Sequence, residues 1–310
     1  MALEHEFRTV LLTGASGFIG GAIAERLVHR AEVRGLTNHP DKNRFGDAVR
    51  SFPYDFERAD GMADAFRSVD VFVNTYYVRF PHGAATFERA VEQSRKLIEH
   101  ARRAGVRRIV HVSVSNADEG SDLPYYSNKA RIERLVRESG IAYTILRPAI
   151  VVGPGDILVN NIAFFLRRLP VFTIFGRGDY RVQPMMLDAF ADVAIEAVDG
   201  GLKNETVPVA GPDDWRFVDL VRAIRAAVGS GAIVVHAPSW AALAGLTVAG
   251  WILRDVVLTR DEVAGLTREY LYSREPLRRG AGFEKWLTTP ATVGYLGRTY
   301  ASELARHFRA

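Results

Sequence analysis

The sequence predicts an α/β protein with a doubly wound parallel sheet and a smaller, mainly helical C-terminal part. A short apolar run, 10–12, ends at a glycine-rich turn, and a helical pattern follows at once. Five further strand-like runs alternate with helix-like segments as far as Pro148. Hydrophobic residues make up 48% of the 310 residues and charged residues 25%, which suits a sizeable buried core.

The opening segment has the form of a phosphate-binding turn. Glycines at 14, 17 and 20 place no Cβ in the way, so backbone N–H groups and the positive helix end can meet a pyrophosphate. The third glycine lets the helix pack close to the strand. A glycine triplet alone is a weak signal, but the strand–turn–helix context is the one that a dinucleotide site requires. We therefore predict dinucleotide binding here.

The remaining elements of the first part follow in order. We expect strands at 31–37, 49–54, 69–76, 108–114 and 141–146, and helices at 59–67, 84–104 and 125–139. This alternation predicts right-handed crossovers and ligand binding at the carboxyl ends of the strands. The dinucleotide-binding domain is expected to span 1–151, with returning elements at about 185–212.

From residue 152 the alternation stops, and 152–310 is expected to form a substrate-binding or lid region. Its expected elements are helices at 156–168, 191–198, 217–228, 240–253 and 298–308, a helix opened by a capping-box pattern at 259–262, and a returning strand at 205–210. The segment 240–253 is the most hydrophobic, but it is shorter than the roughly 20 residues that span a bilayer. We interpret it as a buried helix, with weak contact at a membrane interface as the alternative.

Composition excludes several kinds of function. There is no cysteine, which rules out disulfides, thiolate catalysis and cysteine-ligated zinc, and which suits a cytoplasmic protein. The histidines show no metal-ligand spacing, so no metal is predicted. The net charge is +4, and no nucleic-acid motif accompanies the arginine pairs. A small-molecule substrate is expected, and a nucleic-acid partner is not.

The residues after the second strand bear on the choice of cofactor. A dinucleotide site usually places there either an acid for the adenosine ribose or basic residues for a 2′-phosphate. No carboxylate stands at the strand end, whereas His39, Lys42 and Arg44 follow closely. NADP(H) is therefore favoured over NAD(H), although Asp41 leaves NAD(H) open.

Candidate catalytic residues follow the fifth strand. Tyr125 stands four residues before Lys129, so both lie on one helix face about one turn apart. A nearby ammonium favours the phenolate and lowers the pKa of a tyrosine, which is about 10 unperturbed. A hydroxyl from Ser113 or Ser115 can hold a substrate oxygen. Together these groups provide a general acid for reducing a carbonyl, or a base for oxidising an alcohol.

The residues that carry a family resemblance are Thr13-Gly14-x-x-Gly17-x-x-Gly20, Asp55, Tyr125-x-x-x-Lys129, Leu146-Arg147-Pro148 with Gly153-Pro154-Gly155, and Gln183-Pro184 followed by Asp188. With them the chain resembles the short-chain dehydrogenase/reductase superfamily, in its extended and atypical branches (NAD-dependent epimerase/dehydratase-like and NmrA-like proteins). Segments at 258–262 and 296–305 are similar to a bacterial and archaeal subgroup related to the accessory NAD(P)H-binding subunit of respiratory complex I. The resemblance implies a Rossmann sheet.

The resemblance also implies roles for individual residues. Tyr125 would be the acid/base and Lys129 would bind the nicotinamide ribose, while Ser115 fits the catalytic hydroxyl better than Ser113 because it lies beyond the strand end. Asp55 would contact the adenine. The implied cofactor contacts are Gly14, Ser16, Gly17, Phe18, Ile19, Asn38, His39, Asp55, Asn74, Thr75, Lys129 and Pro148. The expected substrate contacts, with a structural role as the alternative, are Tyr76, Tyr77, Asn160 and Asn161.

Departures from the family pattern bear on the substrate. Two tyrosines, Tyr76 and Tyr77, stand where the family often has a turn rich in small residues. The first interpretation is an NAD(P)(H)-dependent oxidoreductase that acts on a carbonyl or an alcohol. A sugar-nucleotide-type epimerase or dehydratase, and a non-catalytic cofactor-binding sensor or complex I-like subunit, remain as alternatives. The resemblance also implies a homodimer through the helices at 84–104 and 125–139.

Overall fold

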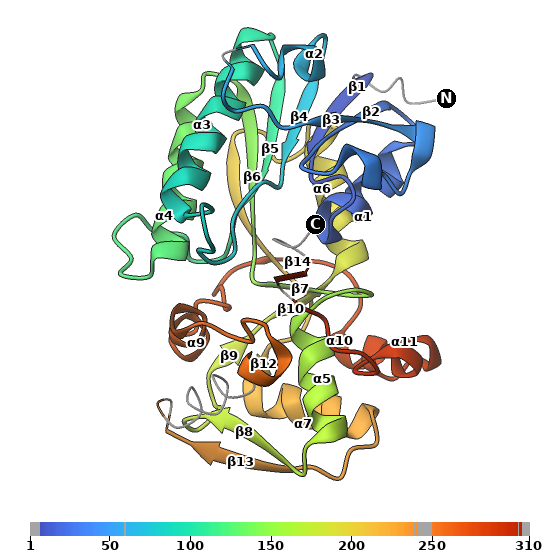
Figure 1. The fold of residues 1–310 in the computed structure, drawn as a ribbon, viewed down its shortest axis with the longest axis vertical. Coiled ribbons are helices and arrows are strands. Elements are labelled where there is room, and N and C mark those ends of the chain that lie inside the picture. The colour runs from blue at the N-terminus through green and yellow to red at the C-terminus, as the bar shows by residue number, and fades with distance from the viewer. Residues whose placement is uncertain (1–6, 59, 239, 241–249, 303, 306–310) are drawn as a thin grey trace. The chain divides into compact units, whose positions relative to one another are not determined.

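The computed structural model describes all residues except 1–6, 59, 239, 241–249, 303 and 306–310, and it contains two compact units (Figure 1). The first unit comprises Met1–Pro148 and Leu187–Val209, and the second comprises Ala149–Met186 and Ala210–Ala310. Each unit encloses a hydrophobic core of its own.

A parallel sheet forms the centre of the first unit. Its strands lie in the order β11–β6–β5–β4–β1–β2–β3, and each neighbouring pair is parallel. The strands are β1 (Thr9–Thr13), β2 (Glu32–Thr37), β3 (Val49–Pro53), β4 (Val71–Asn74), β5 (Arg108–Val112), β6 (Ala142–Pro148) and β11 (Glu205–Ala210). The strand order reverses between β1 and β4, which is where doubly wound sheets bind ligands. The predicted fold class is confirmed.

Helices cover both faces of this sheet (Figure 1). On one face α1 packs against α6, and on the other α3 packs against α4. The helices are α1 (Phe18–Leu27), α2 (Ala63–Phe66), α3 (Phe87–Arg103), α4 (Pro124–Glu138) and α6 (Leu187–Val198). On the α3 side, Phe66, Phe72, Leu97 and Ile109 are fully buried. This burial holds α3 and α4 on the sheet, because each such side chain contributes about 1.5–3 kcal/mol.

The second unit combines helices with small sheets. Its paired strands are β7 (Ile150–Val152) with β10 (Pro184–Met186), β8 (Val171–Phe175) with β13 (Ile233–Ala237), and β9 (Arg181–Val182) with β12 (Trp215–Arg216). Its helices are α5 (Leu158–Arg168), α7 (Phe217–Ala227), α9 (Arg260–Thr267), α10 (Phe283–Leu287) and α11 (Pro290–Tyr295), and β14 (Leu277–Arg278) lies between α9 and α10 in the chain. α5 and α7 pack together around a core that includes Leu166 and Val221.

Several expected elements differ from those observed. The expected helix at 59–67 is reduced to α2, and 298–302 are not helical. The mainly helical C-terminal part also contains the parallel pair β8–β13, whose Val-, Ile- and Phe-rich segments are typical strand formers. The capping box of Thr259 and Glu262 forms as predicted at the start of α9.

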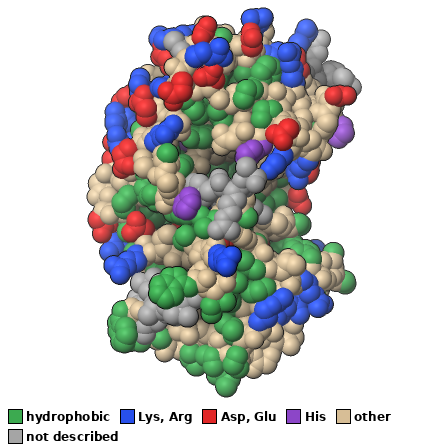
Figure 2. Space-filling view, viewed as in Figure 1, with side chains coloured by type: hydrophobic (Ala, Val, Ile, Leu, Met, Phe, Trp, Pro, Cys, Tyr) green, Lys and Arg blue, Asp and Glu red, His purple; other side chains and the backbone are tan. Residues whose placement is uncertain are grey.

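Hydrophobic side chains reach the surface of the second unit (Figure 2). Most of the segment 240–253, expected to be a buried helix, lies outside the described residues. Of its described side chains, Trp240 is 76% exposed and Trp251 78% exposed, so that interpretation is wrong for both tryptophans. None of the helices in the described part of the chain is long and apolar enough to cross a membrane.

Candidate active site

The glycine turn between β1 and α1 is closely packed on one side and open on the other. Gly14 has φ +65°, and its carbonyl accepts a hydrogen bond from the Gly17 amide at 2.8 Å. A Cβ on Gly20 would lie 2.2 Å from the Gly14 carbonyl oxygen, so only glycine fits there. Ser16 and Gly17 are exposed, and the N-cap residue of α1, Gly17, has no side chain that could cap the first amides. The turn therefore fits a pyrophosphate bound through backbone N–H groups.

Asn74 and Thr75 hold the end of β4 against the end of β1. Thr75 Oγ1 donates to the Thr13 carbonyl at 2.6 Å, and the Thr75 amide donates to Thr13 Oγ1 at 2.7 Å. Asn74 is fully buried, and its Oδ1 accepts from the Tyr76 amide at 3.0 Å. Its Nδ2 makes no hydrogen bond with the described residues. This leaves a hydrogen-bond donor at the end of β4, beside the point where the strand order reverses between β1 and β4. Cofactor contacts by Asn74 and Thr75 stay predictions.

The segment after β2 exposes the groups that were predicted at the adenosine ribose. Asn38 and His39 are both exposed, and the His39 amide donates to Thr37 Oγ1 at 3.1 Å. The Arg44 guanidinium lies against α1, since a Cβ on Gly21 would be 2.4 Å from Arg44 Nη2. That nitrogen donates to Glu25 at 2.7 Å. A basic group is thus present beside the first turns of α1, where it faces one competing carboxylate.

Asp55, predicted at the adenine, organises the loop after β3. Its Oδ1 accepts from the amides of Glu57 and Arg58 at 3.3 and 3.2 Å, and its Oδ2 accepts from Arg58 Nε at 2.6 Å. These hydrogen bonds, chiefly that of the Arg58 side chain, lower the pKa of the Asp55 carboxyl. Asp55 is therefore a carboxylate held by its own loop, and its contact with adenine stays a prediction.

Tyr125 and Lys129 lie one turn apart on α4, as the spacing predicts. Lys129 is 4% exposed, and its Nζ donates to the Val112 carbonyl at the end of β5 at 3.0 Å. Burial lowers the pKa of this ammonium to about 7, and the charge of Glu133 opposes that shift. Tyr125 is half-buried. A lysine that titrates near neutrality beside a tyrosine is an arrangement suited to acid–base chemistry.

Tyr77 covers this pair. Its ring centroid lies 4.3 Å from Lys129 Nζ, a cation–π distance, and its hydroxyl donates to the Tyr125 carbonyl at 3.3 Å. The ring meets Tyr125 edge-on at 5.4 Å and stacks with Phe87 at 6.0 Å. Burial raises the pKa of the Tyr77 phenol, so it stays protonated. The cation–π contact had no signal in the sequence.

Tyr76, the neighbouring candidate, points elsewhere. Its ring packs with Tyr54 and Phe56 at 5.4 and 5.9 Å, and its hydroxyl donates to Gln93. Burial raises the pKa of Tyr76 to about 12. Of the two tyrosines predicted at the substrate, Tyr77 therefore lies beside Lys129, while Tyr76 belongs to the core of the first unit.

The two candidate serines have different surroundings. Ser113 Oγ donates to Glu133 Oε1 at 2.6 Å, so its hydroxyl is engaged by a buried carboxylate. Ser115 lies beyond the end of β5, and its amide donates to the Pro148 carbonyl at 2.9 Å. Ser115 is fully buried. The role of Ser115 as the hydroxyl for a substrate oxygen stays a prediction.

Asn160 and Asn161 act as clamps within the second unit. Asn160 donates to the Thr299 carbonyl and accepts from the Gly297 amide, both at 2.9 Å. Asn161 pairs in the same way with the carbonyl and amide of Ala301, also at 2.9 Å. Both amides are buried and engaged by backbone. This corresponds to the structural alternative, and substrate contact by either residue stays a prediction without support from these contacts.

Replacement of Asn160 by alanine is therefore expected to destabilise the second unit without changing the affinity for the cofactor. The loss leaves a buried carbonyl and amide unpaired, which costs about 1–3 kcal/mol. Urea unfolding measures this change, and Asn38→Ala, at an exposed position, is the control, with an expected effect within about 0.5 kcal/mol. Equal stability of the two variants would contradict the clamp.

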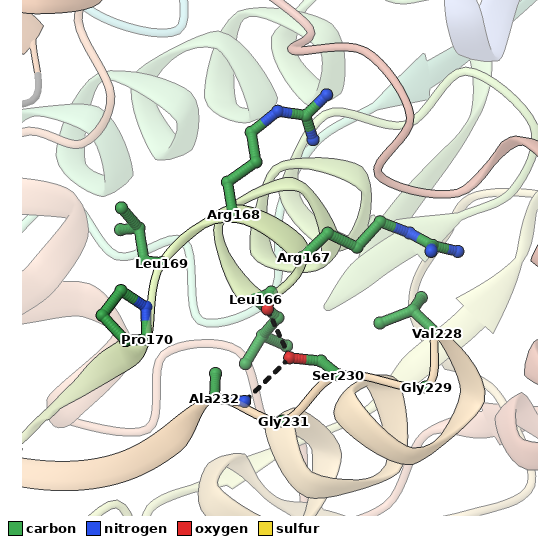
Figure 3. Close-up of a pocket in the computed structure, with 10 residues that line it drawn as sticks. All are labelled: Leu166, Arg167, Arg168, Leu169, Pro170, Val228, Gly229, Ser230, Gly231 and Ala232. Carbon is green, nitrogen blue, oxygen red and sulfur yellow. Dashed lines mark hydrogen bonds between the residues drawn. The ribbon is translucent and has the colours of Figure 1, made fainter.

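A hollow of about 420 Å³ lies in the second unit, between the end of α5 and the loop 228–232 (Figure 3). Ser230 Oγ donates to the Leu166 carbonyl and accepts from the Ala232 amide. Arg167 and Arg168 also line it, and their guanidinium groups hydrogen-bond backbone carbonyls of the segment 293–298. Since the lining offers no acid–base pair, we place the candidate active site in the first unit. The part of the chain that the structure describes contains no cluster suited to a metal ion.

Residues 14–156 match a family model described as NAD(P)H-binding. The mitochondrial 40 kDa subunit of NADH-ubiquinone oxidoreductase from Neurospora crassa is 28% identical over 163 residues, which are 50% of this chain. They cover 44% of that subunit, and the match to the mitochondrial NADH dehydrogenase 1 alpha subcomplex subunit 9 of Arabidopsis thaliana covers 53%. The chain thus spans about half the length of these curated relatives.

Two solved structures share the fold. A nucleoside-diphosphate-sugar epimerase from Staphylococcus aureus superposes with a TM-score of 0.71 at 16% identity, covering 91% of this chain and 100% of the other. The NADPH-dependent quinone oxidoreductase QOR2 from Escherichia coli, in complex with NADPH, gives 0.69 at 20% identity, with 85% and 91% covered. At these identities the likeness establishes the fold.

Proposed function

We propose that residues 14–156, which match a family model described as NAD(P)H-binding, bind NAD(P)H, and that the chain is an oxidoreductase of the atypical short-chain dehydrogenase/reductase type. It would transfer hydride to or from a carbonyl or alcohol carbon of a small molecule. One observation carries the proposal: Lys129 is buried one helical turn from Tyr125, beside the end of β5, with a pKa near 7. The carboxyl ends of the strands are where such a sheet binds its ligands.

The proposed chemistry assigns one task to each side chain. Tyr125 donates a proton to the substrate oxygen in reduction and accepts it in oxidation. The ammonium of Lys129 would stabilise the phenolate form of Tyr125 by charge attraction. Ser115 holds the oxygen in place. The nicotinamide, when bound, supplies or accepts the hydride.

The glycine turn and the segment after β2 would hold the cofactor. Gly14, Ser16, Gly17, Phe18 and Ile19 offer backbone to the pyrophosphate, which is supported by the exposed, uncapped start of α1. Asn38 and His39 would lie at the adenosine ribose, and Asp55 at the adenine. Pro148 would lie at the nicotinamide end, because it ends β6 beside Ser115.

NADPH is expected to bind more tightly than NADH, by about tenfold or more, since a charge-assisted hydrogen bond to a phosphate contributes about 1.5–3 kcal/mol. His39, Lys42 and Arg44 supply the basic groups, and no carboxylate stands at the end of β2. Titration of the protein with each cofactor, followed by nicotinamide fluorescence, measures the ratio of the NADH dissociation constant to the NADPH dissociation constant. Glu25→Gln, which removes the partner of Arg44, should increase the ratio. Equal dissociation constants would remove the preference for NADP(H), and the absence of binding would overturn the oxidoreductase.

A second candidate function is a cofactor-binding subunit or sensor without turnover. It is favoured by the sequence similarity to a subunit of NADH-ubiquinone oxidoreductase, and by the ring of Tyr77 over Lys129. Such a protein would bind NAD(P)H but would not need the Tyr125 phenol. Turnover of the Tyr125 variant therefore separates the two functions.

A further inference from the structure

A buried carboxylate lies one helical turn after Lys129. Glu133 is fully buried on α4, and its Oε1 accepts from Ser113 Oγ at 2.6 Å and from Arg147 Nε at 2.8 Å. Its Oε2 accepts from Arg147 Nη2 at 2.5 Å and from Arg137 Nη2 at 2.6 Å. Three of these four hydrogen bonds, one from Ser113 and two from the Arg147 guanidinium, thus tie α4 to the ends of β5 and β6, and the fourth lies within α4.

The charges around Lys129 make this carboxylate important. The titratable and charged groups come from four places: His111 on β5, Tyr77 after β4, Arg147 on β6, and Tyr125, Glu133 and Arg137 on α4. Burial and the charge of Lys129 keep the pKa of His111 well below its usual value, so His111 is neutral. Arg137 and Arg147 are cations, Lys129 is a cation when it is protonated, and Glu133 is the acid whose charge acts on Lys129.

We propose that Glu133 is a positioning residue for the proposed reaction, whose carboxylate fixes α4 against β5 and keeps the Lys129 ammonium charged beside Tyr125. The inference rests on the proposed function for its purpose, but its physical content concerns the chain alone. Glu133 does not touch the reacting atoms. It acts through Lys129, one turn away on the same helix.

The electrostatic sign follows from the neighbours. Burial has already brought the pKa of Lys129 down to about 7, with Glu133 opposing the shift. Removing the carboxylate charge takes away the acid that pairs with both guanidinium groups among the described residues, and it lowers the pKa of Lys129 further. Removing Arg137, which is partly exposed, takes away a cation and has the opposite effect. Substitution of Glu133 should thus lower the pKa of Lys129, and substitution of Arg137 should raise it.

Lysine NMR can measure this directly, without turnover. The chain has five lysines, Lys42, Lys96, Lys129, Lys203 and Lys285, so selective ¹³C labelling gives five Cε signals, and Lys129→Arg assigns the buried one. In the cofactor-free protein we expect the Lys129 midpoint near pH 7. Glu133→Gln should lower it by about one pH unit, and Arg137→Gln should raise it. Glu138→Gln, which removes an exposed acid from the same helix, is the matched control and should not move it.

The outcomes are distinct. A Glu133→Gln protein that is folded by circular dichroism and has an unchanged Lys129 midpoint would overturn the proposal. If that variant does not fold, Arg137→Gln decides, and the absence of an upward shift would equally overturn it. The Lys129 midpoint can also move as expected in a protein that turns over no carbonyl substrate. That result would support the effect of Glu133 on Lys129 and would contradict the proposed oxidoreductase activity. In an active enzyme, the pH profile of kcat should shift in the same direction as the Lys129 midpoint.

Discussion

Replacement of Tyr125 by phenylalanine is expected to lower kcat by about 10²–10⁴-fold, the usual contribution of a positioned general acid or base. The substitution removes the hydroxyl but keeps the ring, which packs edge-on against Tyr77 at 5.4 Å and Tyr126 at 5.2 Å. The fold and the NADPH dissociation constant should therefore stay close to those of the wild type. Steady-state oxidation of NADPH with a panel of ketones and quinones measures kcat, and fluorescence titration measures the NADPH dissociation constant.

Tyr126→Phe is the matched control for this experiment. It removes a phenol from the next position of α4, where the side chain is buried, and it should leave kcat within about twofold because no proton transfer is assigned to it. Unchanged turnover in the Tyr125 variant would exclude this tyrosine as the acid/base. Absence of turnover in the wild type as well, with NADPH still bound, would favour the non-catalytic subunit or sensor.

Replacement of Gly20 by alanine is expected to impair both stability and cofactor binding. The new Cβ would lie 2.2 Å from the Gly14 carbonyl oxygen, which is backbone and cannot rotate away. Either α1 or the turn must shift, at a cost of about 1–3 kcal/mol typical of overpacking. A shifted turn also misaligns its N–H groups, and the loss of one charge-assisted hydrogen bond weakens NADPH binding by about tenfold or more.

Gly294→Ala provides the comparison. Gly294 also lies in a helix, α11, but a Cβ there would meet nothing within 4 Å. Alanine should leave NADPH binding unchanged and alter stability by at most about 1 kcal/mol, in the stabilising direction. Urea unfolding and NADPH titration of both variants measure the difference. A Gly20 variant that binds NADPH as the wild type does would mean that this turn does not hold the cofactor.

Local patterns in the sequence predicted the framework of the first unit, because alternating strands and helices are short-range features. The helical spacing of Tyr125 and Lys129 placed both on α4, and the glycine turn lies between β1 and α1. The carboxylate of Glu133 was missed, although it follows Lys129 at the same spacing of four. A glutamate on a helix ordinarily faces solvent, and its burial depends on Arg147, which reaches it from β6.

Long-range contacts account for the rest. The amides of Asn160 and Asn161 pair with backbone 137–140 residues later in the chain, which no local pattern indicates. The strands β8 and β13 contain strand-forming residues, but their pairing joins segments about 60 residues apart. The position of Tyr77 depends on Phe87 and Tyr125, so it is set by packing and not by its own sequence neighbourhood.

The ring of Tyr77 over the Lys129 ammonium has a thermodynamic consequence for any ligand that uses this lysine. In the free protein the cation already has an aromatic partner at 4.3 Å. A ribose that binds the ammonium replaces that contact. Its observed binding free energy is therefore the free energy of the ribose–ammonium contact minus that of the lost Tyr77–ammonium contact. The loss of a cation–π contact of about 0.5–2 kcal/mol raises the dissociation constant of the cofactor by roughly two- to thirtyfold. Substituting Tyr77 with leucine would therefore tighten cofactor binding, and the aromatic side chain would act as an intramolecular competitor that sets the concentration range in which the protein responds.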